Sequence, residues 1–294
     1  MFARLNEGKT FPVLLILTLL MVIWYGAAIK LNTPWQLDIY QRGDITEWTT
    51  TQFISDTLNQ DRPVLPSAHQ VFTEMWNTIV GKSITSKRSL VFHAWITLSA
   101  TLLGFAIGTG LGILIAVGII HNRAMDRSLM PWIVASQTIP ILAVAPMIIV
   151  VLNAIGLSGL LPKALISTYL SFFPIVVGMV KGFRSPEQIQ LDLMHTYSAG
   201  PMQTFFKLRW PSSVPYLFTS MKVAIAIALV GAIVGELPTG AVAGLGARLL
   251  SGSYYGQTVQ IWSALFTAAA LAAVLVMLVG LAEKLVIKRM GMAT

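Results

Sequence analysis

Residue types that carry out chemistry are few in this 294-residue chain, and their spacing selects no reaction. Its four histidines, His69, His93, His121 and His195, lack the spacing of metal ligands, and the absence of cysteine excludes disulfides and thiolate metal sites. The sequence has no GxxxxGK[ST] phosphate loop and no serine, histidine and aspartate set that spacing would single out. We therefore expect a protein that is not an enzyme, holds no cofactor or metal, and cannot hydrolyse ATP by itself.

The most informative polar stretch runs from Asp192 to Pro211 and reads DLMHTYSAGPMQTFFKLRWP. It interrupts a chain that is 55% hydrophobic and only 11% charged, with a mean hydropathy of +0.72. A chain embedded in lipid needs hydrophilic surface only where it meets water or a partner. This polar stretch is therefore a candidate docking element.

The elements around it are apolar runs of about 20 residues, the length that crosses about 30 Å of hydrocarbon. We expect an all-α polytopic membrane protein with about six spanning helices, over residues 11–29, 95–120, 131–155, 160–182, 215–234 and 261–281. No internal repeat is evident.

The third run contains Pro140 and Pro146, each of which removes a helix hydrogen bond and would normally bend or break the helix. In a membrane such breaks survive where protein or a water-filled cavity satisfies the freed groups. We expect this run to line a path through the membrane, with Gln137, Thr138 and Asn153 as its polar residues. Simple packing against lipid is the alternative.

Charge distribution predicts the orientation. Basic residues lie mainly beside the apolar runs, so membrane orientation explains the net charge of +8 better than nucleic-acid binding. With both termini in the cytoplasm, the organisation is a cytoplasmic N-terminus 1–10, a first transmembrane helix 11–29, a periplasmic segment 30–90, a five-helix core 91–285 with a cytoplasmic loop 183–214, and a cytoplasmic C-terminus 286–294. A cleaved signal peptide is the competing interpretation of the first run, but the run is long and its A-x-A site is poor.

The segment 30–90 contains one further predicted helix, over 68–80, which Ser67 could cap. Its apolar stripe consists of Val71, Phe72, Met75, Trp76 and Ile79. The helix either lies along the outer membrane interface or packs on the bundle.

The polar stretch resembles the cytoplasmic loop of permease subunits of bacterial ABC importers, whose pattern is E-A-A-x3-G-x9-I-x-L-P. In this register Pro211 is the final proline, Leu208 and Trp210 stand at the I and L, Ser198 stands at the G, and Asp192, Leu193 and Met194 stand at E-A-A. Supporting segments are Leu65-Pro66-Ser67, Leu103-Gly104-Phe105, PILAVAP from Pro140 to Pro146, Phe172-Phe173-Pro174 and Gly244-Leu245-Gly246. Together they resemble the nitrate, sulfonate, taurine and pyrimidine-precursor branch of the family, from Leu65 to the C-terminus.

The resemblance implies a type I importer permease of the bacterial inner membrane. Its partners would be two cytoplasmic ATPase subunits, a periplasmic solute-binding protein and a second permease copy, which we expect to make a homodimer in membrane lipid. The ATPase-coupling residues would be Asp192, Leu193, Met194, Tyr197, Ser198, Phe205, Leu208 and Pro211.

The apolar side chains of the loop would allow it to dock, because a helix over about 186–207 could insert into an ATPase groove. Its anchors would be Leu191, Met194, Tyr197, Phe205 and Phe206. Asp192 would lie near its start, free to accept backbone N–H groups or to pair with Arg209. An interfacial helix on lipid headgroups is the alternative.

Glu236 ends an apolar run and is followed by Pro238, Gly240, Gly244 and Gly246, which predict a folded-back turn near the outer face. The carboxylate could accept backbone N–H groups, pair with Arg248, form an outer gate on the path, or merely mark the water interface.

A stand-alone secondary transporter or channel is the competing function. Such transporters usually show internal repeats and ionisable groups at mid-depth, whereas these spans are nearly charge-free apart from Lys222 and Glu236, near the two ends of the fifth. The solute would be a pyrimidine-type heterocycle or a small sulfonate- or nitrate-like anion. The lack of an arginine on the path does not favour a strongly anionic solute.

Overall fold

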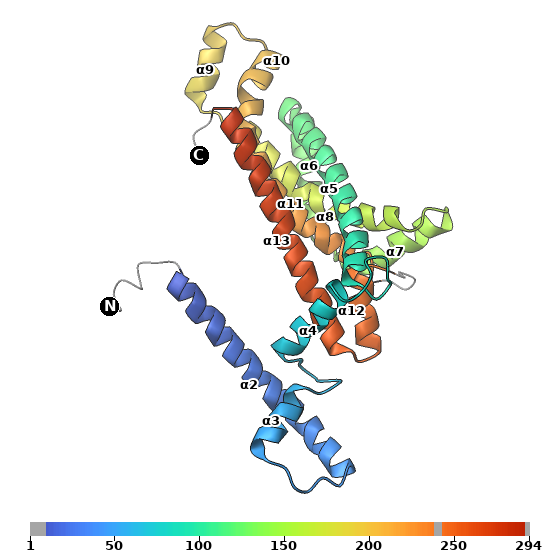
Figure 1. The fold of residues 1–294 in the computed structure, drawn as a ribbon. Coiled ribbons are helices and arrows are strands. Elements are labelled where there is room, and N and C mark those ends of the chain that lie inside the picture. The colour runs from blue at the N-terminus through green and yellow to red at the C-terminus, as the bar shows by residue number, and fades with distance from the viewer. Residues whose placement is uncertain (1–9, 238–242, 292–294) are drawn as a thin grey trace, which may run out of the picture. The chain divides into compact units, whose positions relative to one another are not determined.

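A computed structural model describes residues 10–237 and 243–291 of the chain. Every regular element in these ranges is helical, which confirms the all-α fold (Figure 1). The elements are α2 (Thr10–Arg42), α3 (Thr50–Leu58), α4 (Ala68–Ile79), α5 (Leu90–His121), α6 (Arg123–Ser136), α7 (Ile141–Ala154), α8 (Leu160–Phe183), α9 (Gln188–Thr196), α10 (Pro201–Thr204), the π-helix η1 (Phe205–Arg209), α11 (Trp210–Val234), α12 (Leu245–Tyr254) and α13 (Thr258–Arg289).

Within the described residues, five helical stretches are long and apolar enough to cross a membrane: 11–42, 90–121, 160–183, 201–234 and 258–289. A sixth span results only if α6 and α7, which are bent by 98° at a short break, are taken together. Six spans were expected, so the count depends on this bent pair.

The chain divides into two compact units, residues 1–91 with 248–267 and residues 92–247 with 268–294. The first unit contains α2, whose 33 residues make a helix of about 50 Å, some 20 Å longer than the hydrocarbon layer. The sequence pattern ended this helix at residue 29. The structure continues it because two polar residues beyond that point, Asn32 and Gln36, are buried against residues 60–66.

Asn32 shows how that extension is held. Its amide oxygen accepts the N–H groups of Val64 and Leu65 at 2.8 and 3.1 Å, and its amide nitrogen donates to the Leu65 carbonyl at 2.8 Å. Gln60 donates to Gln36 at 2.8 Å in the same region. In the same unit, α4 covers residues 68–79, where a helix over 68–80 was expected; Val71 is buried while Phe72 and Trp76 are exposed.

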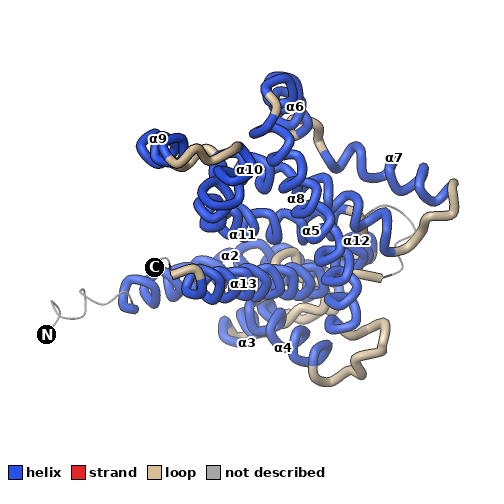
Figure 2. The backbone as a smooth tube through the Cα atoms, turned by 90° about the horizontal axis from the view of Figure 1, so that it is seen from above, coloured by secondary structure: helices blue, strands red, loops and turns tan. Residues whose placement is uncertain are grey.

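In the second unit α8 and α11 pack side by side (Figure 2), and small residues allow the close approach. A Cβ added to Gly178 would lie 1.7 Å from Ser220 Oγ, and one added to Gly182 would lie 2.9 Å from Ser213 Cα. Ser167 Oγ donates to the Ala228 carbonyl at 2.6 Å. Larger residues at these contacts would push the helices apart, so α8 and α11 form a tightly joined pair.

The break between α6 and α7 occurs at only one of the two prolines expected to disturb the third run. Pro140 precedes α7 in an extended conformation, whereas Pro146 lies inside α7, which continues through it. The carbonyl of Ser136, at the end of α6, accepts a hydrogen bond from the Tyr169 hydroxyl of α8. A protein group therefore satisfies a carbonyl that the break frees, as the membrane environment requires.

Candidate functional site

The loop between α8 and α11 is a helical hairpin, formed by α9 and α10, at one end of these two long helices (Figure 1). α9 begins after Glu187, whose backbone N–H donates to Gln190 Oε1 at 3.1 Å and so gains a partner at the helix start. A single helix over 186–207 was expected. The structure instead breaks the helix after Tyr197 and reverses the chain.

Ser198 makes the break. Its φ of +52° is in the left-handed region that favours glycine. Its N–H donates to the His195 carbonyl at 2.8 Å, and the next N–H, of Ala199, donates to the Met194 carbonyl at 2.9 Å. This pair of bonds is the Schellman pattern that ends many helices, usually with glycine at the left-handed position. The conformation gives a physical reason for glycine at this position of the E-A-A pattern.

One face of α9 is apolar and exposed. Ile189, Leu193 and Tyr197 follow at four-residue spacing and are 73%, 55% and 76% exposed. Met202 and Phe206 add exposed apolar side chains just beyond the turn. These five side chains are referred to as the docking surface.

The residues expected to couple fall into three groups. Asp192, Leu193, Tyr197 and Ser198 are exposed, and Met194, Leu208 and Pro211 are half-buried. Phe205 is 5% exposed and packs against the rings of Phe183 and Trp210. It therefore belongs to the interior of the second unit and not to the docking surface.

The polar contacts of the loop differ from those expected for Asp192. Asp192 lies in the middle of α9, and its carboxylate accepts a hydrogen bond from Gln188 Nε2 at 2.9 Å. Arg209, its expected partner, donates instead to the Phe183 carbonyl at 2.7 Å. That contact joins the start of α11 to the end of α8, so the base of the hairpin is fixed to both helices.

The π-helix η1 follows from Pro211. Proline has no N–H, and its ring crowds the carbonyl four residues earlier. Both effects disturb the i to i−4 hydrogen bonds of an α-helix. The hydrogen-bond spacing here is i to i−5, and the Trp210 N–H donates to the Phe205 carbonyl. The final proline of the pattern thus reshapes the junction between hairpin and α11.

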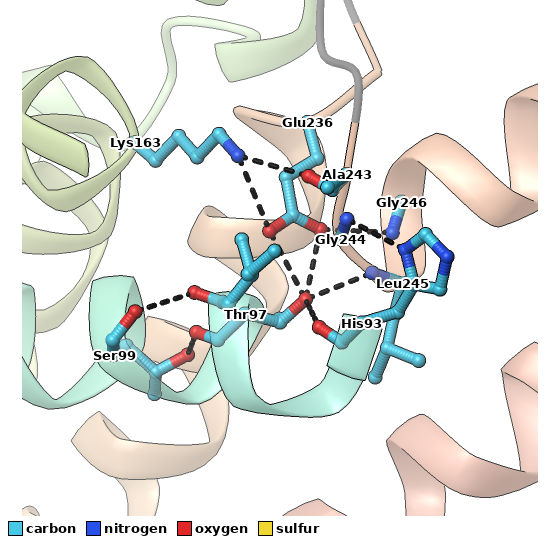
Figure 3. A network of polar contacts seen from close by, with 11 residues as sticks. His93, Thr97, Ser99, Lys163, Glu236, Ala243, Gly244, Leu245 and Gly246 are labelled. Atoms are coloured by element: carbon cyan, nitrogen blue, oxygen red, sulfur yellow. Dashed lines mark hydrogen bonds and ion pairs between the residues drawn. The ribbon is translucent and has the colours of Figure 1, made fainter. Parts of the chain in front are cut away.

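A second polar site surrounds Glu236, whose side chain is fully buried (Figure 3). Three consecutive N–H groups, where the turn leads into α12, each meet a different side-chain acceptor at 2.9 Å: Gly244 donates to His93 Nδ1, Leu245 to Thr97 Oγ1 and Gly246 to Glu236 Oε2. The three acceptors are referred to as the clamp. The clamp joins α5 to the residues that follow α11.

The charge of Glu236 is only partly compensated. Thr97 Oγ1 lies 3.0 and 2.9 Å from the two carboxylate oxygens, and Lys163 Nζ lies 3.7 Å from Oε1. Glu236 lies beyond the end of the 201–234 span, and burial raises its pKa to about 7 although Lys163, Gly246 and Thr97 oppose the rise. Lys163 also donates to the Ala243 carbonyl at 3.1 Å. The partners of Glu236 are therefore the Gly246 N–H, the Thr97 hydroxyl and Lys163. Arg248, an expected partner, instead faces the amide of Gln260.

The glycines of the turn lie directly against the carboxylate. Gly244 has φ +130°, and a Cβ there would lie 2.1 Å from Glu236 Cδ; a Cβ on Gly246 would lie 2.8 Å from Glu236 Cβ. Only glycine allows this approach. Pro238 and Gly240, which contributed to the expected turn, lie outside the described residues.

Sequence reasoning identified Glu236 but missed His93, Thr97 and Lys163. His93 and Thr97 are four apart and so share a helix face, which was the available signal. Their partners are more than 130 residues away in the sequence, and no local pattern indicates such a contact.

The four residues predicted for a path are not brought together. Gln137 and Thr138 lie at the break between α6 and α7, and Asn153 lies in the last turn of α7, about 18 Å further along that helix. Thr138 and Asn153 are exposed, whereas Glu236 is sealed in the second polar site.

Residues 108–292 match the family described as binding-protein-dependent transport system inner membrane component. The formylaminopyrimidine transport permease protein ThiX of Halalkalibacterium halodurans is 36% identical over 57% of this chain and 66% of that relative. The riboflavin transport system permease protein RibX of Chloroflexus aurantiacus is 32% identical over 76% of this chain and 80% of the relative.

The fold also matches a solved structure, an inward-facing conformation of the MetNI methionine ABC transporter. The TM-score is 0.53 at 20% identity, over 68% of this chain and 95% of the matched chain. At this identity the match supports the fold alone.

Proposed function

Because the chain belongs to the family of inner membrane components of binding-protein-dependent transport systems, we propose that it is the permease subunit of an ATP-driven importer. In this function it takes a small solute from a periplasmic binding protein and releases it into the cytoplasm. The chain itself supplies the membrane path, and ATP hydrolysis is carried out by partner ATPase subunits. Five or six apolar spans and a family match over 108–292 support this function.

The observation that carries the proposal is the docking surface on the α9–α10 hairpin. Three of its apolar side chains are more than half exposed on a single helix face, at the position where the sequence keeps the register of the coupling pattern. Exposed apolar and aromatic side chains of this kind form the core of protein interfaces. Because the hairpin base is fixed to α8 and α11, a force applied by an ATPase would reach both helices.

A charge on the docking surface tests this role. Leu193→Glu should reduce the amount of ATPase that copurifies with the permease at least tenfold, because it places a carboxylate in an apolar interface. Tyr255→Glu is the matched control, since Tyr255 is 70% exposed in the turn between α12 and α13. Both variants should reach the membrane at wild-type levels. Wild-type copurification by Leu193→Glu would exclude the hairpin as the coupling element.

The two relatives named above support a heterocyclic solute, since their names refer to a formylaminopyrimidine and to riboflavin. We propose a pyrimidine-type heterocycle as the solute of this chain. Thermal-shift screening of the cognate binding protein tests this: stabilisation by heterocycles supports it, and stabilisation only by sulfonates or nitrate contradicts it.

The assembly we propose is a homodimer with both termini in the cytoplasm. Supporting the dimer, α7 carries Leu142, Met147 and Val150, which are 63%, 67% and 67% exposed and wholly apolar. Gln137, Thr138 and Asn153 would then line the path between the two copies, with Glu236 at its outer end.

A further inference from the structure

The α9–α10 hairpin, referred to below as the coupling hairpin, lies at one end of α8 and α11. The polar site around Glu236 lies at the other end of these two helices. Lys163 stands in the first turn of α8 and Glu236 follows the last turn of α11, whereas the hairpin joins the end of α8 to the start of α11. The 24 residues of α8 correspond to about 36 Å. One tightly joined helix pair therefore connects the two sites.

Packing makes this pair suitable for transmitting movement. The contacts of Gly178 with Ser220 and of Gly182 with Ser213 lie toward the hairpin end, and that of Gly231 with Ser167 lies toward the clamp end. Close-packed contacts of this kind resist sliding and bending, since interiors are dense and compress little. A displacement of the hairpin would move the far ends of α8 and α11 against α5, which carries the other two acceptors of the clamp.

We propose that His93, Thr97 and Glu236 are positioning residues for transport: they hold the Gly244–Gly246 turn against α5 and release it once in each cycle, in step with the coupling hairpin. This inference rests on the proposed importer function. Release breaks three hydrogen bonds between the turn and side chains, and it exposes a carboxylate that the turn now covers.

Two features of the clamp fit a contact that opens. The ion pair of Lys163 with Glu236 is loose at 3.7 Å, and the Lys163 side chain is 13% exposed, so the lysine partner reaches the surface while the carboxylate is covered. Hydration of the carboxylate on opening would offset part of the lost hydrogen bonding. The high pKa of Glu236 agrees with this, because it shows that burial outweighs the compensation the network provides.

The Thr97 hydroxyl is the most specific point of the clamp. It accepts the Leu245 N–H and has a single proton, which it can donate to Glu236 or to the His93 carbonyl at 3.2 Å. Thr97→Val keeps the shape of the side chain and removes both functions of the hydroxyl. Thr97→Ser restores them.

The experiment uses the assembled transporter, with its ATPase and binding protein, in lipid vesicles. Thr97→Val should retain basal ATP hydrolysis, because the hairpin is intact, and lose at least tenfold in solute uptake and in stimulation of hydrolysis by loaded binding protein. Thr97→Ser should recover both. Ser99→Ala is the matched control on α5, since Ser99 Oγ donates to the Ile96 carbonyl of its own helix at 2.8 Å.

A direct measurement of opening accompanies the kinetics. Carbodiimide labelling of Glu236, quantified by mass spectrometry, should rise at least fivefold between the nucleotide-free and the ATP-trapped transporter, or fall by the same factor. Equal labelling in both states, or a Thr97→Val variant with wild-type stimulation and uptake, would overturn the clamp. Absence of ATP-driven uptake by the wild-type assembly would instead overturn the importer function, and the clamp with it.

Discussion

Ser198 occupies a backbone conformation that an L side chain disfavours, and this single residue ends α9 and turns the chain toward α10. A non-glycine residue in the left-handed region costs about 1 kcal/mol. The two Schellman hydrogen bonds hold it there. The strain lies in the segment that we propose contacts the ATPase, so a substitution at Ser198 alters hairpin geometry before it alters any contact with a partner.

Ser198→Gly should therefore stabilise the hairpin by at most about 1 kcal/mol and raise the melting temperature of the detergent-solubilised protein by roughly 2 °C. Ser198→Val should lower it, because a β-branched residue tolerates the left-handed region poorly. Thermal unfolding followed by circular dichroism measures both. Val and Gly variants that melt together would show that φ at this position is not strained.

Glu236 predicts a pH dependence of stability. Burial raises its pKa from 4.5 to about 7, so the folded protein binds more protons than the unfolded chain between these values. The free energy of unfolding should accordingly fall as the pH rises from 5 to 7 and then level off, by at most about 3 kcal/mol. In Glu236→Gln, which does not titrate, this part of the decline should vanish. Parallel curves for the two proteins, by thermal unfolding at pH 5 to 8, would contradict the assignment.

At the scale of elements, the bent pair of α6 and α7 is the least regular part of the second unit. Pro140 lies at the break, directly before α7, where the chain bends by 98°, whereas α7 continues through Pro146. Gln137 and Thr138 lie at this break, outside the regular hydrogen bonding of both helices. Polar side chains at such a break suit a water-accessible path.

Cysteines at Gln137 and Asn153 should react with small polar thiol reagents at rates that differ at least fivefold between the nucleotide-free and ATP-trapped transporter. The chain contains no native cysteine, so the background is negligible. Cysteine at Met147, 67% exposed on α7, is a matched control with an apolar surrounding. Equal rates in both states at Gln137 and Asn153 would remove these residues from the path.

The sequence patterns predicted elements better than they predicted ends and contacts. Apolar runs located the helices because lipid requires about 20 apolar residues per span. The end of α2 was missed because Asn32 and Gln36 are polar, yet they are buried by partners from residues 60–66. Pro211 revealed the register of the E-A-A pattern. The break at Ser198 was missed because it depends on backbone geometry, and the contacts of Thr97 were missed because its partners are distant in the sequence.

At the scale of the whole molecule, one ion pair joins two of the spanning helices. Lys222 of α11 pairs with Glu283 of α13, and both side chains are partly exposed. Pairing lowers the cost of placing these charges beside the apolar segments. The expected sixth run ended before Glu283, whereas α13 continues to Arg289.

The proposed orientation is testable with a reporter that is active only in the cytoplasm. Fusion after Met194 or at the C-terminus should give activity, because basic residues accumulate on the cytoplasmic side. Fusion near Asn59, in the turn that follows α3, should be silent. Activity at Asn59 would invert the topology and would place the docking surface outside the cell.

The seam of small residues between α8 and α11 sets a rule for building chimeras. Ser220 leaves no room for a Cβ at position 178, and the close approach of the Ser213 backbone leaves none at position 182. The packing surfaces of α8 and α11 are therefore complementary. Hybrid permeases that take α8 from one parent and α11 from another would have helices that do not pack closely. Crossover points placed in the break between α6 and α7, or after Tyr254, take α8 and α11 from the same parent. Such chimeras would keep this packing while solute preference is exchanged together with the path residues.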